Sequence, residues 1–189
     1  MIAADRAETY DRLVTQTSLS LPSGFQPRPL SERDHLPVLA AVGEWWGTPQ
    51  APELGLLLPR LFFQHFTVLS EVVETVSADD EAKQIAAFLI AFHSATHPDR
   101  AYIHFVGVDP QWRGRGIAAA LYERLFTAAR ARGCTRVDAV TSPANRGSRA
   151  FHAALGFTAH GDTQIDGVTA FADYDGPGHA RVALTRMLE

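Results

Sequence analysis

A glycine-rich turn between an apolar segment and an amphipathic segment most restricts the fold of this 189-residue chain. The turn is Gln111-Trp112-Arg113-Gly114-Arg115-Gly116. Residues 101–108 before it are aromatic and β-branched, which predicts a buried strand that ends at Asp109-Pro110. After the turn, apolar residues recur at helical spacing up to Gly133, which predicts a helix with a glycine end. The chain therefore passes from strand to helix through two glycines.

Such a junction suits a bound anion. Glycine lets the backbone approach a ligand closely, and a helix start offers unpaired N–H groups at the positive end of the helix dipole. Arg113 and Arg115 add two positive charges. We therefore predict a cradle for a phosphate-bearing cofactor, although glycines that only relieve strain in a tight turn are the alternative. A Walker loop is excluded because Ile117-Ala118 follows the last glycine, and a dinucleotide fingerprint because Ala119 replaces its third glycine.

Two segments together resemble the GNAT N-acetyltransferase superfamily. Gln111-x-x-Gly114-x-Gly116 after a Val-x-Pro strand end resembles its acetyl-CoA signature, and Asn145…Ala150-Phe151…Leu155-Gly156-Phe157 resembles its second conserved segment. The resemblance covers roughly Tyr102 to Phe157. It implies an α/β (α+β) fold with a mixed, mostly antiparallel central sheet flanked by helices. It also implies acetyl-CoA as cofactor and an amine as acceptor.

The resemblance also implies which residues meet the coenzyme. In the family, the strand before the glycine turn splays from the next strand, and its free amides pair with the pantetheine arm and polarise the thioester carbonyl. This role falls to Val106, Gly107 and Val108. The residues expected around the diphosphate are Gln111, Trp112, Arg113, Gly114, Arg115, Gly116, Ile117 and Ala118. Asn145 matches a position that often contacts the pantetheine or nearby backbone, and helix capping explains it equally well.

Acetyl transfer needs a base for the amine and a proton for the leaving thiolate. Period-two alternation puts His104 on one strand face with Val106 and Val108, so we expect His104 to act as the base. A buried histidine satisfied by a neighbour is the alternative. The family's usual acid is a tyrosine, and His152 stands in its place after Phe151. His152 is the candidate acid, with a shorter reach and a different pKa.

The acceptor is less constrained. In the family, the first two helices, their connection and the final hairpin form the acceptor groove, which implicates Trp45, Trp46 and His65. The adjacent tryptophans, in a predicted turn, either cap the core or line the groove. We predict direct transfer to a primary amine of a small molecule in a ternary complex. A non-catalytic acyl-CoA-binding sensor or structural module of the same fold is the alternative, because the usual tyrosine is missing.

Composition limits the partners. With 46% hydrophobic and 20% charged residues, the chain is expected to form a single domain over 1–189, with 1–20 as a loose arm or short helix. The net charge of −4 argues against nucleic acid, and no apolar stretch predicts a membrane span. A single cysteine, Cys134, fits a cytoplasmic protein. His93 and His97 have zinc-like spacing but lie in a predicted loop, so we expect no metal. The family is often dimeric, and nothing in the sequence decides whether this chain forms a homodimer.

The remaining patterns predict the other elements in outline. They are an edge strand at 24–30, a helix from Ser31 to Gly43, a helix at 52–65 that Pro59 kinks or delays, strands at 67–76 and 84–92 as an antiparallel hairpin, a strand at 135–140, a helix at 146–155, and strands at 158–160, 168–172 and 181–188.

Overall fold

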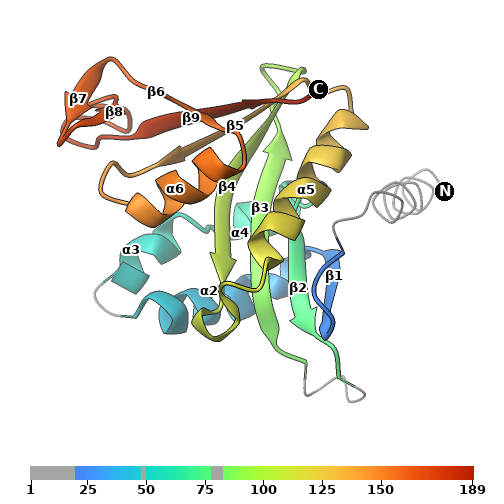
Figure 1. Ribbon diagram of the computed structural model, residues 1–189. Helices are drawn as coiled ribbons and strands as arrows, with labels where there is room; N and C mark the ends of the chain where they lie inside the picture. Colours follow the sequence, from blue (N-terminus) through green and yellow to red (C-terminus); the bar gives the residue numbers. More distant parts are fainter. Residues whose placement is uncertain (1–19, 48–49, 78–82) are drawn as a thin grey trace.

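A mixed sheet with helices on both faces forms the protein, of which the computed structural model describes residues 20–47, 50–77 and 83–189 (Figure 1). The seven strands have the order β1-β2-β3-β4-β5-β9-β6, and only β4 and β5 are parallel. Their bounds are Phe25–Pro29 (β1), Glu71–Thr75 (β2), Ile85–His93 (β3), Arg100–Val108 (β4), Arg136–Thr141 (β5), Thr158–His160 (β6) and Val182–Met187 (β9). The predicted fold class is confirmed.

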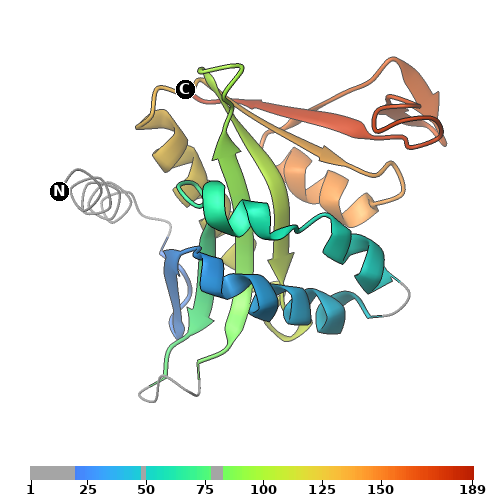
Figure 2. The same cartoon turned by 180° about the vertical axis from the view of Figure 1, so that it is seen from behind.

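The helices divide between the two faces of this sheet. Helices α5 and α6 cover the face seen in Figure 1, and α2, α3 and α4 cover the face seen in Figure 2. Their bounds are His35–Trp46 (α2), Gln50–Leu56 (α3), Arg60–His65 (α4), Ile117–Arg130 (α5) and Arg146–Ala154 (α6), with short 3-10 turns at Glu32–Asp34 (η1) and Pro110–Trp112 (η3). None of the helices in the described ranges has the length and apolar character needed to cross a membrane.

Each face carries its own apolar core. On the α5 side, the helix buries the predicted apolar stripe, including Ile117, Leu121 and Leu125, against β3, β4 and β5. On the other side, α2 and α4 pack on aromatic residues of β3 and β4. The sheet therefore separates two surfaces, and a ligand can approach β4 from either side only where a neighbouring strand or helix leaves it uncovered.

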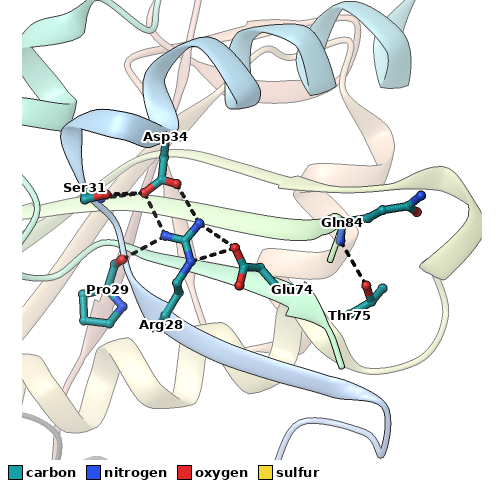
Figure 3. A network of polar contacts seen from close by, with 7 residues as sticks. All are labelled: Arg28, Pro29, Ser31, Asp34, Glu74, Thr75 and Gln84. Carbon is teal, nitrogen blue, oxygen red and sulfur yellow. Dashed lines mark hydrogen bonds and ion pairs between the residues drawn. The ribbon is translucent and has the colours of Figure 1, made fainter. Parts of the chain in front are cut away.

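Arg28 fastens the first strand to the rest of the sheet (Figure 3). Its guanidinium binds both oxygens of Asp34 at 2.7 and 2.8 Å, and its Nε donates to Glu74 at 2.8 Å. Ser31 adds two further hydrogen bonds to Asp34, one from its amide and one from its hydroxyl. Burial alone would raise the pKa of Asp34, but these hydrogen bonds outweigh it and lower the pKa.

Three local predictions need correction. The tryptophans 45 and 46 lie in the last turn of α2 rather than in a loop, because Trp45 is buried against Phe88 with ring centroids 5.7 Å apart. The predicted helix at 52–65 is two helices, and Pro59 is the N-cap of the second. A strand at Thr163–Ile165 (β7) was not predicted; it pairs with Val168–Ala170 (β8) in a separate hairpin. The predicted arm at 1–20 lies, except for its last residue, outside the described residues.

Candidate active site

The strands β4 and β5 diverge after a short parallel pairing (Figure 1). The pairs run only from Arg100↔Arg136 to Ile103↔Ala139, whereas β4 continues to Val108 and stays paired with β3 to that end. Residues His104 to Val108 therefore have no strand partner on the β5 side within the described chain. We call this stretch the open edge of β4.

The peptide groups of Val106 and Val108 point into the gap beside the open edge. The amide of Asp109 donates to the Ala86 carbonyl of β3 at 2.9 Å. Because hydrogen-bond direction alternates along a strand, Val106 and Val108 face away from β3, and Gly107 faces towards it. In agreement, the Val108 carbonyl accepts a bond from Arg113 Nε at 3.0 Å instead of from β3. Among the described residues, the amides of Val106 and Val108 and the carbonyl of Val106 thus have no backbone partner and can bind an extended ligand arm.

The glycine turn joins the end of this edge to α5. Gly114 and Gly116 have φ values of 74° and 84°, a left-handed conformation that strongly favours glycine. A Cβ built at either position meets no atom within 4 Å, so the space in front of the turn is open. Within the described part of the chain, no hydrogen-bond partner meets the amides from Gly114 to Ala119. These amides lie at the helix start, where an anion is stabilised.

The beginning of the turn serves its own structure. The amides of Gln111, Trp112 and Arg113 donate to the side chain of Asp109, the carbonyl of Asp109 and the carbonyl of Pro110. The guanidinium of Arg115 stacks over the ring of Trp112, 5.2 Å from its centroid, and lies 5.6 Å from the ring of Phe25. Of the predicted cradle, the amides of Gly114, Arg115, Gly116, Ile117 and Ala118 are available to a ligand.

A β-bulge in β4 changes the face of His104. Ile90 pairs with Phe105 and Ala91 pairs with Ile103, so His104 is the additional residue. Two consecutive residues, His104 and Phe105, consequently lie on the α4 side, while Val106 and Val108 pack against the α5 side. The prediction that His104 shares a face with Val106 and Val108 is therefore wrong.

Residues of α4 and of the segment before α4 fix the orientation and the protonation of the His104 ring. Its ring stacks on Phe62 at 4.0 Å between centroids, and Nε2 lies 2.6 Å from the Leu57 carbonyl. A carbonyl can only accept, so Nε2 carries the proton and Nδ1 keeps a lone pair. Burial lowers the pKa of His104, and the bond to Leu57 opposes this only in part. A neutral imidazole with one free nitrogen is suited to accept a proton.

His152 lies in the interior between α5 and α6. Its Nδ1 donates to the Ser148 carbonyl at 2.8 Å, and Nε2 accepts from the Tyr122 hydroxyl at 3.0 Å. Only 4% of the residue is exposed, and burial lowers its pKa. Burial also raises the pKa of Tyr122, which keeps its proton for this bond. Both ring nitrogens of the candidate acid are therefore occupied by protein groups.

The other predicted residues have identifiable places. Asn145 caps α6, because its side chain accepts from the Ser148 amide at 3.0 Å. Trp46 packs on Phe105 at 5.8 Å between ring centroids, beneath the open edge. His65 lies at the end of α4, beside a separate hollow formed with Phe92 and His93. Trp46 thus borders the candidate site, whereas the structure does not bring His65 to the open edge.

Sequence reasoning missed the residues that orient His104. Leu57 and Phe62 precede it by more than forty positions, and no local pattern connects them. A helix predicted across Pro59 also concealed the break that brings the Leu57 carbonyl to the imidazole. Their contribution follows from how α3 and α4 pack on the sheet, which is a tertiary property.

The chain belongs to the acetyltransferase (GNAT) family. The profile described as "Acetyltransferase (GNAT) family" matches residues 40–157, which include the open edge of β4, the glycine turn and α6. The family and the fold expected from the two sequence motifs are thereby confirmed.

Individual relatives are more distant. L-2,4-diaminobutyric acid acetyltransferase from Halalkalibacterium halodurans is 26% identical over 88 residues, a match that spans 47% of this chain and 47% of that protein. A GNAT-family protein from Desulfovibrio desulfuricans has a TM-score of 0.64 at 18% identity, over 87% of this chain and 99% of that one. Diaminobutyrate acetyltransferase EctA from Paenibacillus lautus, in complex with L-2,4-diaminobutyric acid and coenzyme A, has a TM-score of 0.59 at 19% identity, over 86% and 93%. At these identities the solved structures support the fold alone.

Proposed function

We propose that this protein transfers an acetyl group from acetyl-CoA to a primary amine of a small molecule, by direct attack in a ternary complex. The observation that carries the proposal is the run of amides from Gly114 to Ala118, beside the open edge of β4, to which no described residue bonds. Membership of an acetyltransferase family supports the coenzyme. The relatives named for diaminobutyrate support an amine acceptor.

The residues fit the coenzyme without rearrangement of the backbone. The amides of Gly114 to Ala118 would bind its diphosphate, because they are unpaired and lie at a helix start. The amide and carbonyl of Val106 and the amide of Val108 would bind the pantetheine arm, or the Val106 amide would polarise the thioester carbonyl. When bound, acetyl-CoA supplies the acetyl group and a thiolate leaving group.

His104 would act as the base from the α4 face of the sheet, opposite to the face on which Val106 and Val108 pack. Its Nδ1 takes the proton that the amine gives up as the nitrogen bonds to the acetyl carbon and the C–S bond breaks, with the electron pair leaving on sulfur. His152 could protonate that sulfur only by giving up its bond to Tyr122 or Ser148. We therefore propose that the thiolate takes its proton from solvent, which the thiol pKa of about 8.5 makes feasible.

The binding step is tested by titration calorimetry with acetyl-CoA. Gly116→Val places a branched side chain in the open space before the turn and should weaken binding at least tenfold. Gly133→Val is the matched control, because Gly133 also has a positive φ and open surroundings but follows the far end of α5. Equal affinities in the two variants would show that the turn is not the coenzyme site.

The transfer step is tested by thiol release from acetyl-CoA across a panel of primary amines. We expect release that depends on the amine and is lost in His104→Ala. One observation favours a second candidate function, an acyl-CoA-binding sensor: the position of the usual acid holds a histidine with both nitrogens occupied. Tight binding with no release for any amine would support that function instead.

A further inference from the structure

A pocket of about 330 Å³ lies beside the first half of β4, and Tyr102, which lines it, is two residues before His104. Its floor is a row of three side chains on adjacent strands, Tyr102, Asp138 and Thr185. The ring of Phe92 lies 5.4 Å from Tyr102 and 6.3 Å from Phe62, the residue that stacks on His104. The pocket and the proposed base are therefore separated by little more than one aromatic side chain.

The pocket offers one carboxylate oxygen without a partner. Oδ1 of Asp138 accepts from Arg136 Nε at 2.6 Å and from Thr185 Oγ1 at 3.0 Å. Arg136 also donates to Thr185 Oγ1, so the three side chains hold one another. Among the residues that the structure describes, none donates to Asp138 Oδ2. The carboxylate is thus fixed through one oxygen and can accept from a ligand with the other.

The pocket is also bordered by a cation, Arg100. Its Nε is buried and has no hydrogen-bond partner in the described chain. Asp99 Oδ1 lies 3.8 Å from Nε, close enough for an ion pair but too far for a hydrogen bond. The Arg100 side chain as a whole is 33% exposed, so a ligand carboxylate in the pocket would be attracted to its charge. Arg100 and Asp138 border the same hollow.

Tyr102 lies opposite Asp138, two residues after Arg100, and stays neutral. Burial raises its pKa to about 12, with smaller contributions from Tyr174, Asp175 and Asp138. Its hydroxyl therefore keeps its proton and has no partner in the described chain. Tyr174, in the chain after β8, forms part of the pocket wall. The result is a partly aromatic pocket bordered by a carboxylate that has one oxygen without a partner in the described chain and by the cation of Arg100.

We propose that this pocket holds the amino-acid head of the acceptor, with its ammonium group on Asp138 Oδ2 and its carboxylate on Arg100. The side-chain amine of the same molecule then reaches His104. Asp138 lies opposite Tyr102, which is two residues before His104. Two residues of a strand span about 6.6 Å, a distance that suits a short diamino acid. A pocket with the carboxylate alone would suit any diamine, and the additional guanidinium of Arg100 is what selects a zwitterion. The inference rests on the proposed function, because it takes the acceptor to be acetylated beside His104.

The test compares three acceptors that differ by one group each. They are 2,4-diaminobutyrate, 1,3-diaminopropane, which lacks only the carboxylate, and 4-aminobutyrate, which lacks only the α-ammonium group. With saturating acetyl-CoA, thiol release should give a kcat/KM at least tenfold higher for 2,4-diaminobutyrate than for either analogue. This comparison uses the wild-type enzyme alone and does not depend on the folding of a variant.

Two substitutions then test which group of the acceptor each residue binds. Asp138→Asn should lower kcat/KM about tenfold or more for the two acceptors with a second ammonium group and leave 4-aminobutyrate unchanged. Arg100→Gln should lower it for the two acceptors with a carboxylate and leave 1,3-diaminopropane unchanged. Asp162→Asn, an exposed carboxylate between β6 and β7, is the control and should change none of them. Retained acetyl-CoA affinity shows that each variant is folded.

The outcomes separate the two proposals. Equal kcat/KM for the three acceptors, or variants that affect all acceptors alike, would overturn the zwitterion site and leave acetyl transfer standing. Binding of acetyl-CoA without thiol release for any primary amine would overturn the transfer itself, and the acceptor site with it.

Discussion

Replacing Gly107 with alanine tests how tightly Phe88 and Trp46 pack against the open edge of β4. A Cβ at this position would lie 2.7 and 2.9 Å from two ring atoms of Phe88 and 2.9 Å from Trp46 Cη2. Phe88 is fully buried and stacks on both Trp45 and Phe105, so its ring cannot move without disturbing the core. Overpacking of this kind costs about 1–3 kcal/mol. We expect about 2 kcal/mol, which for a chain of this length lowers Tm by about 4–8 °C.

Thermal and urea unfolding followed by circular dichroism measure this effect. Gly147→Ala is the matched control: the nearest atom to its Cβ is 3.9 Å away and the site is helical, so it should stabilise the protein by up to about 1 kcal/mol. Combining Gly107→Ala with Phe88→Leu should cost less than the sum of the single changes, because leucine vacates the space that the new methyl group needs. If Gly107→Ala unfolds at the wild-type temperature, the close packing of Phe88 and Trp46 against Gly107 is refuted.

Three further predictions concern titrating groups. Burial lowers the pKa of His104, so wild-type kcat/KM should stay level down to about pH 6.5 and fall below it, whereas His104→Ala should be about 100-fold slower and flat over that limb. Folding also lowers the pKa of His152. As pH falls, the imidazole therefore becomes protonated in the unfolded chain before it does in the folded protein. Urea midpoints should therefore fall as pH drops below about 6.5, and less steeply in His152→Leu. Arg28→Met leaves buried Asp34 without its cation and should cost about 3 kcal/mol at pH 7. Because the pKa of Asp34 is lowered on folding, the difference from wild type in urea unfolding should begin to shrink as pH falls below about 4 and be lost once pH falls below the lowered pKa of the folded protein.

The glycine turn and the helices on the α5 side were predictable because their determinants are local. The turn from 111 to 116, the helix after it and the Asn145 cap each depend on residues a few positions apart. Glycine at a left-handed φ, apolar residues at helical spacing and an asparagine before a helix have one physical meaning each. What the sequence could not reveal is which turn amides bind the protein itself, since this depends on the path of the chain from Asp109 to Arg113.

The surroundings of His104 and the pocket near it were harder to predict because they are assembled across strands. Strict alternation gives the wrong face for Val106 relative to His104, since a bulge is set by the register between β3 and β4. Asp138 reaches the pocket only because β5 runs parallel to β4 and pairs it with Tyr102. Gly43 and Gly47 suggested a break around the tryptophans, but packing of Trp45 on Phe88 extends α2 past Gly43.

The bulge also bears on how donor and acceptor would meet. The open amides of the turn and the side chains of Val106 and Val108 lie on the α5 side, and His104 lies on the α4 side of the same strand. A thioester bound along the open edge could thus be attacked through the gap by an amine arriving from the other face. An acyl-enzyme finds no support in the described chain, because Cys134 is buried, burial raises the pKa of its thiol, and it precedes β5 at the end opposite the divergence. Direct transfer across the thickness of one strand is the mechanism that this arrangement favours.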